Sequence, residues 1–135
     1  MVLENDYLMR MILLFVQVLK QALGQRHKDP QQSAQELEAE IANAVNIDAS
    51  LFFSLAPESM VTFLQLGDFD QRLAEYIVRA MALAADFLDT AEQPRTAELR
   101  RSQLNALVNA YSLDISESDL SYEAIDRFIQ QAEQV

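Results

Sequence analysis

Residues 7–23, YLMRMILLFVQVLKQAL, decide the fold of this chain. On a helical wheel their polar side chains gather into one narrow stripe, and apolar side chains cover most of the remaining circumference. A helix of this kind must be covered by neighbours on several sides. The stretch therefore predicts the core helix of a helical domain. Its apolar side chains are Leu8, Met9, Met11, Ile12, Leu14, Phe15, Val16, Val18, Leu19 and Leu23.

The composition of the chain favours the same fold class. Its 135 residues match the length of one domain, and 50% of them are apolar. The chain has two glycines and three prolines, and its long segments consist largely of the helix formers Ala, Leu, Gln and Glu. We predict an all-α fold: a single compact domain over residues 1–135 with about six or seven helices, packed as helical hairpins or as an irregular bundle.

Start and stop signals divide the chain into these helices. Asn5 or Asp6 can cap the first helix, and Gly24 can end it. We expect a last helix to begin after Ser118 and to end near Gln134. The other predicted starts are Asp29-Pro30, the segment before Leu51, Pro57, Asp68-Phe69-Asp70-Gln71 and Gln93-Pro94.

A second long helix is predicted over about residues 69–89. Five alanines lie between positions 74 and 85 of this helix, and such small side chains let a neighbouring helix approach closely. We expect this helix to lie against the first one, and the two together to occupy the centre of the domain.

The charge of the chain bears on its partners and its location. The net charge is −11, and residues 31–92 carry eleven acidic and two basic side chains. Such a field repels phosphate and anionic membrane surfaces, so we expect neither a nucleic-acid partner nor a membrane partner. The first apolar run contains Arg10 and is short for a membrane span. Because cysteine is absent as well, we expect a cytoplasmic protein.

Few side chains in the sequence are spaced for catalysis or metal binding. The single histidine, His27, lacks the spacing of a metal motif or of a local catalytic triad. The carboxylate pairs Asp86/Asp89 and Glu36/Glu40 each share a helix face, where they either are solvated or hold a divalent cation against a facing pair. We favour solvated faces, and we expect no catalytic residues, no metal and no cofactor.

Arg10 is the most informative single residue of the first helix. A guanidinium on an otherwise apolar helix is expected to be paired, either with Asp6 or a carboxylate from another helix, or with an anionic ligand or partner. Tyr7 lies close enough along the helix to share that network. Asp6, Tyr7 and Arg10 therefore form the predicted ion-pair or partner site.

Part of the middle of the chain resembles a tetratricopeptide repeat, in which two helices form an antiparallel hairpin. Arg72 and Arg79 occupy positions where that repeat has small residues, and no second copy of about 34 residues is present. The resemblance implies hairpin packing of two helices, without a repeat array. It rests on Gly67-Asp68-Phe69-Asp70, Tyr76 and Ala80, with Phe63 as the aromatic of the first helix.

The start of the chain resembles an uncharacterised family of small bacterial all-helical proteins that open with Asp-Tyr-x-x-Arg-x-Ile. The matching stretch here is Asp6-Tyr7-Leu8-Met9-Arg10-Met11-Ile12, and the Leu-rich region over residues 51–66 and the long alanine-rich helix agree with it. The resemblance extends to about residue 111 and implies a bacterial intracellular protein. It implies no particular activity.

The function that these observations favour is a non-catalytic protein–protein interaction or scaffold module. An excess apolar face on the first helix also permits a homodimer. The alternative is a small-molecule or lipid-binding protein, in which aromatic side chains and methionines line an apolar pocket rather than fill the core. The aromatic set in question is Phe15, Phe52, Phe53 and Phe63.

Overall fold

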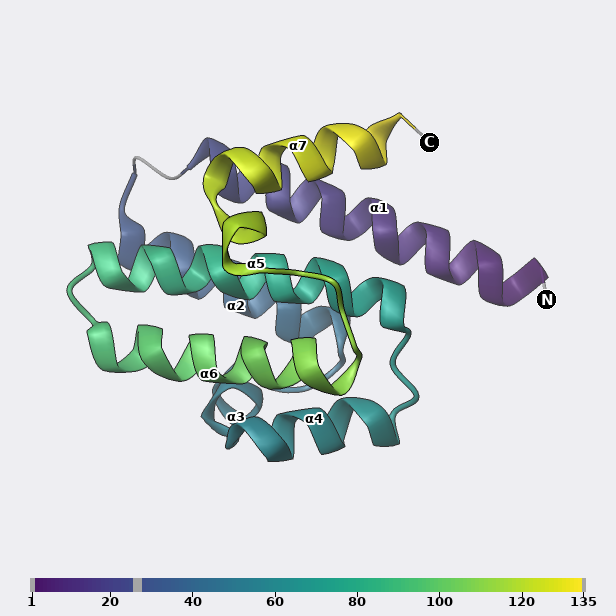
Figure 1. Ribbon diagram of the computed structural model, residues 1–135, viewed down its shortest axis with the longest axis horizontal. Coiled ribbons are helices and arrows are strands. Elements are labelled where there is room, and N and C mark those ends of the chain that lie inside the picture. The colour runs from purple at the N-terminus through teal and green to yellow at the C-terminus, as the bar shows by residue number, and fades with distance from the viewer. Residues whose placement is uncertain (1, 26–27, 135) are drawn as a thin grey trace.

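The computed structural model describes the backbone of residues 2–25 and 28–134, and the side chains of residues 6–25 and 28–134. Within these residues the chain is helical and forms no strand, as predicted (Figure 1). In the described part of the chain, seven α-helices and one short 3-10 helix form a single packed bundle. They are α1 (Val2–Gly24), α2 (Pro30–Ala44), α3 (Ala49–Ser54), α4 (Pro57–Leu66), α5 (Gln71–Thr90), α6 (Pro94–Ala110), η1 (Glu117–Leu120) and α7 (Tyr122–Glu133).

Helix α5 is the centre of the bundle. Fourteen of its twenty residues are buried, and it packs against α6, α2 and α1. Its five alanines lie among these buried residues, so α2 and α6 can approach its backbone closely. In Figure 1, α1 and α7 lie on one side of α5, whereas α6, α4 and α3 lie on the other. The expected contact between the two long helices is confirmed, with Phe15 of α1 stacked on Tyr76 of α5.

Helix α1 is covered by three neighbouring helices, as expected, but they leave part of its apolar circumference exposed. Its buried face packs against α5, α7 and α2. On the opposite face Tyr7, Met9, Leu13 and Leu14 are all exposed. The physical reason is that α5, α7 and α2 all pack on the other face of α1, and in Figure 1 the N-terminal end of α1 also projects past the ends of α5 and α7.

Two of the expected helix caps lie elsewhere. Because α1 begins at Val2, neither Asn5 nor Asp6 is its cap. Helix α5 begins at Gln71, and its cap is Asp70, which accepts a hydrogen bond from the backbone N–H of Arg72. Asp68, the expected cap, has a φ of 55° and ends α4 in a left-handed turn. That turn delays the start of α5 by two residues.

The packing of α4 corrects the tetratricopeptide resemblance. Helix α4 packs against α6 and makes few contacts with α5, although α5 follows it directly in the chain. A tetratricopeptide hairpin would place these two consecutive helices against each other. The extensive hairpin of this fold is instead formed by α5 and α6, which the short turn over residues 91–93 joins. The architecture is therefore an irregular bundle.

One helix segment has the length and hydropathy of a membrane span. Within the described residues this is Asp6–Gly24, of which 39% is buried inside the bundle. The same segment supplies the packed face of α1, which is what the core helix of a bundle requires. Its composition alone therefore does not indicate a membrane protein.

Candidate binding groove

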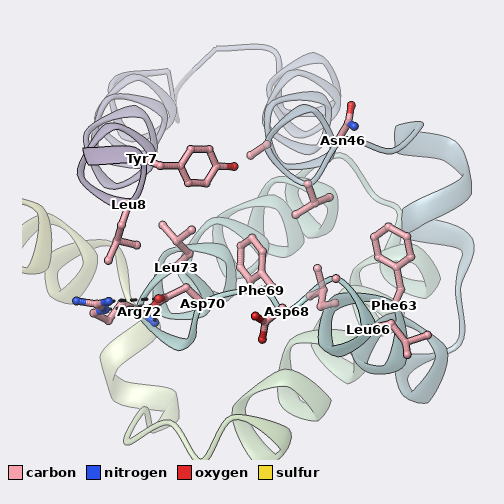
Figure 2. A pocket seen from close by; sticks show the side chains of 14 residues that line it. Tyr7, Leu8, Asn46, Phe63, Leu66, Asp68, Phe69, Asp70, Arg72 and Leu73 are labelled. Atoms are coloured by element: carbon pink, nitrogen blue, oxygen red, sulfur yellow. Dashed lines mark hydrogen bonds and ion pairs between the residues drawn. The ribbon is translucent and has the colours of Figure 1, made fainter. Parts of the chain in front are cut away.

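A groove of about 930 Å³ opens between the N-terminal half of α1, the end of α2 and the turn that joins α4 to α5. We call it the Tyr7 groove, after the side chain that extends from α1 toward α2 in Figure 2. Its volume lies in the range of pockets that hold ligands or the anchoring side chains of a partner. Its lining includes Tyr7, Leu8, Ala44, Asn46, Phe63, Leu64, Leu66, Asp68, Phe69, Asp70, Arg72 and Leu73.

The floor of the Tyr7 groove is apolar because three helices bring a buried leucine to the same place. Leu8 comes from α1, Leu64 from α4 and Leu73 from α5, and each belongs to the hydrophobic core. The Phe69 ring lies between these helices and is partly exposed (Figure 2). Leu66, at the edge of the groove, is 83% exposed. The core therefore continues outward into an apolar surface that water contacts.

Charged side chains line the turn between α4 and α5. Arg72 donates from Nε and Nη2 to the two carboxylate oxygens of Asp70, each at 3.3 Å. The Arg72 hydrogen bond lowers the pKa of Asp70, although partial burial opposes that shift. Asp68 is exposed and forms no ion pair with any described residue. The turn therefore presents one neutralised carboxylate and one free carboxylate.

Two helix C-termini add negative potential to the same groove. Helix α2 ends at Ala44 and α4 ends at Leu66, and both residues line the Tyr7 groove. An uncapped helix C-terminus acts as roughly −0.5 of an elementary charge, and here turn N–H groups donate to most of the last carbonyls of both helices, so the remaining charge is smaller. Each end is closed by a residue with a positive φ, Asn46 and Asp68 respectively. The N-terminal end of α5, which has the opposite sign, is capped by the carboxylate of Asp70.

The predicted site residues separate in the structure. Tyr7 lines the groove and is 56% exposed. Asp6 and Arg10 are exposed on α1 outside the groove lining. Among the ion pairs between described side chains, none includes Arg10, so the expected pairing with Asp6 is not present.

The aromatic side chains proposed for an apolar pocket mostly fill the core. Phe15, Phe52 and Phe53 are buried, and Phe52 makes edge contacts with both Phe53 and Phe63. Of the four, Phe63 also lines the Tyr7 groove. A pocket built from all four rings is therefore not present.

Three of the four carboxylates in the two acidic pairs accept hydrogen bonds or form ion pairs with described side chains. Asp86 and Asp89 both form ion pairs with Arg101, whose Nη2 lies 2.9 Å from Oδ1 of Asp86 and 2.7 Å from Oδ2 of Asp89. Burial raises the pKa of Asp86 although Arg101 acts in the opposite direction. Glu36 accepts a hydrogen bond from Gln32.

Within the described residues no three potential ligands converge on a metal site. His27 lies outside these residues.

Sequence reasoning missed two buried arginines. Arg100 of α6 pairs with Glu38, and Arg79 of α5 lies 3.6 Å above the ring of Phe128. Burial lowers the pKa of Arg79, and its Nε has no hydrogen-bond partner among the described atoms. A signal for Arg100 exists in the sequence, because it lies on the same helical stripe as Leu104, four residues later.

No protein family, curated protein or solved structure matches this chain. The resemblance of its opening to small bacterial helical proteins therefore stays a prediction. What can be said of function rests on the geometry of the bundle and of the Tyr7 groove.

Proposed function

We propose that this chain is a non-catalytic protein-interaction module of the bacterial cytoplasm, and that the Tyr7 groove receives its partner. The observation that carries the proposal is the continuity of the core with an open apolar surface. The buried floor of Leu64 and Leu73 leads directly to Leu66, which is 83% exposed at the edge. An apolar surface that is open to water and rimmed by polar groups is typical of a protein-binding site.

The shape of the groove favours a helical partner. Its walls are the sides and ends of helices, and its floor is a row of leucines and aromatic rings. An amphipathic helix places side chains at positions i, i+3, i+4 and i+7 on one face, which is the pattern that such grooves accept. Tyr7 and Phe69 offer rigid aromatic contacts at little cost in side-chain entropy.

The second candidate function is small-molecule or lipid binding in the same groove. The observation in its favour is the volume of about 930 Å³, which a drug-sized ligand or part of an acyl chain would fill. The two candidates differ in how far binding depends on Leu66. An acyl chain would contact the groove floor without the exposed edge at Leu66, whereas a partner helix would contact both.

The test is a titration of the ¹⁵N-labelled protein with two probes, followed by NMR. One probe is an uncharged amphipathic peptide of about 16 residues with leucines on one helical face and glutamines elsewhere. The other is palmitate. We expect the peptide to shift the amide signals of Leu64, Phe69 and Leu73, and to leave those of Glu98 and Ser102 on α6 unchanged.

Two matched variants locate the binding surface. Leu66→Lys changes an exposed leucine at the groove edge, and Leu13→Lys changes an exposed leucine on α1 outside the groove lining. We expect the first to weaken peptide binding and the second to leave it unchanged. Peptide shifts confined to α1 around Leu13 would contradict the proposal. Binding of palmitate without binding of the peptide would replace it with the second candidate.

A further inference from the structure

The charges around the Tyr7 groove indicate which kind of helix it receives. We propose that the partner is a basic amphipathic helix, whose apolar face packs on the groove floor and whose Lys or Arg side chain pairs with Asp68. This inference rests on the proposed function, because it names the chemistry of the partner at the same groove.

Asp68 is the charged group that is available to a partner. It is exposed at the turn, and within the described part of the chain it has no ion pair. The neighbouring Asp70 is already engaged by Arg72 at 3.3 Å. The C-terminal ends of α2 and α4 face the same lining with their negative partial charges. A cation placed beside Asp68 would therefore pair with its carboxylate and lie next to the C-terminal end of α4, which Asp68 closes.

The apolar lining suits a long basic side chain as well as a leucine. Lysine and arginine place their methylene groups on apolar surfaces and keep the charged end near water or a carboxylate. The rings of Tyr7, Phe63 and Phe69 come from three different segments and offer faces for such contacts. A cation over an aromatic ring gains further electrostatic attraction. An acidic side chain would gain neither the contact of a cation with a ring nor an ion pair with Asp68.

The field of the whole molecule acts in the same direction. Residues 31–92, which contain α3 to α5 and all of α2 except Pro30, carry eleven acidic and two basic side chains. A field of this sign attracts basic segments from a distance and repels a second copy, whose net charge is also −11. A basic helix therefore matches the groove better than another copy of this chain does.

Three peptides and two variants test the inference. The peptides share one leucine face and carry lysine, glutamine or glutamate at the flanking positions. Binding of each is measured by isothermal titration calorimetry at about 50 and about 300 mM salt. Asp68→Asn removes the charge and keeps the turn, because asparagine tolerates a positive φ as aspartate does. Asp114→Asn, at another exposed aspartate, is the matched control.

We expect the lysine peptide to bind most tightly and the glutamate peptide least tightly, with a gap that narrows at higher salt. In Asp68→Asn the affinity for the lysine peptide should fall about two- to fivefold, as for other exposed ion pairs, while that for the glutamine peptide stays unchanged. Asp114→Asn should change neither affinity.

The outcomes separate this inference from the proposed function. Equal affinity for all three peptides, with groove residues shifted in each case, would refute the basic partner and leave the interaction module standing. Preference for the lysine peptide that Asp68→Asn does not reduce would also refute the assignment of Asp68. If none of the peptides binds, both proposals fail together.

Discussion

The Nε atom of Arg100 lies 2.6 Å from Oε2 of Glu38, in a contact that joins α6 to α2. The second pair of atoms, Nη2 and Oε1, lies at 3.2 Å, so the ion pair is bidentate. The two side chains are 9% and 14% exposed. Arg100 also donates from Nη1 to the backbone carbonyl of Phe53 at 2.9 Å, near the end of α3. One guanidinium thus joins three helices.

We predict that Glu38→Ala destabilises the fold strongly. The substitution leaves the Arg100 guanidinium buried without its carboxylate, and breaking a buried pair in this way costs about 3–5 kcal/mol of unfolding free energy. Glu36→Ala is the matched control, because Glu36 lies on the same helix but is exposed. We expect that change to cost less than about 0.5 kcal/mol. Urea denaturation followed by circular dichroism measures both, and equal losses would contradict the prediction.

We predict that Arg10→Met leaves the melting temperature within about 2 °C of the original value. Arg10 is exposed and forms no ion pair with any described residue, so its charge supports no contact in the bundle. Arg100→Met should lower the melting temperature far more, because it removes a buried pair. Differential scanning calorimetry of the two variants measures both effects. A large loss for Arg10→Met would restore Arg10 as a structural anchor.

These two arginines illustrate what the sequence could predict. The apolar periodicity of residues 73–88 was sufficient to identify a buried helix, and the all-α class followed from composition. The sequence pattern does not predict that Arg100 is buried and Arg10 is exposed. Both lie on helices with apolar neighbours, and burial depends on which other helix crosses at that point. Helix α2 supplies Glu38 to Arg100, whereas Arg10 is exposed on α1 and no other described helix supplies a carboxylate to it.

The Tyr7 groove was partly predictable from the sequence. The position of Tyr7 near Arg10 predicts a site residue, but its structural role comes from the groove that it lines. The other lining residues lie far apart in the chain, and local spacing cannot bring Asn46 and Asp68 together. The turn at residues 67–70 was identified from its glycine and aspartates. What local signals could not reveal is that α4 turns away from α5 and leaves the space open.

We predict that Asp70 makes the stability of the fold depend on pH in acid. The Arg72 hydrogen bond lowers the pKa of Asp70 below its usual 3.8 in the folded protein. The unfolded chain therefore binds more protons near that pH, so the stabilising contribution of Asp70 is present above pH 3.8 and is lost as pH falls through the lowered value. Asp70→Asn keeps a capping side chain and removes this dependence.

The measurement is urea denaturation of the original protein and of Asp70→Asn at about pH 6 and about pH 3. We expect the original protein to be more stable at the higher pH, and the difference between the two proteins to shrink at the lower pH. Asp114→Asn serves as the control, because Asp114 is exposed and takes part in no ion pair between described side chains. A difference that grows in acid would have the wrong sign for this mechanism.

We predict that the exposed face of α1 supports weak self-association. Met9 and Leu13 lie four residues apart on one face and are 47% and 57% exposed. Residues 1–30 carry four basic and three acidic side chains, so pairing of two α1 helices brings together the least acidic part of each molecule. Added salt should strengthen the association, because it screens the repulsion between two chains of net charge −11.

Native mass spectrometry and sedimentation velocity measure this self-association as a species of twice 15.3 kDa. Leu13→Lys should abolish the self-association. In a two-fold contact the lysines of the two chains would face each other, and their like charges would repel. Leu51→Lys, at an equally exposed leucine on α3, should leave it intact. Because Leu13 lies outside the lining of the Tyr7 groove, its substitution also separates the two surfaces. A dimer that persists in Leu13→Lys and is lost in Leu66→Lys would mean that a second copy occupies the groove.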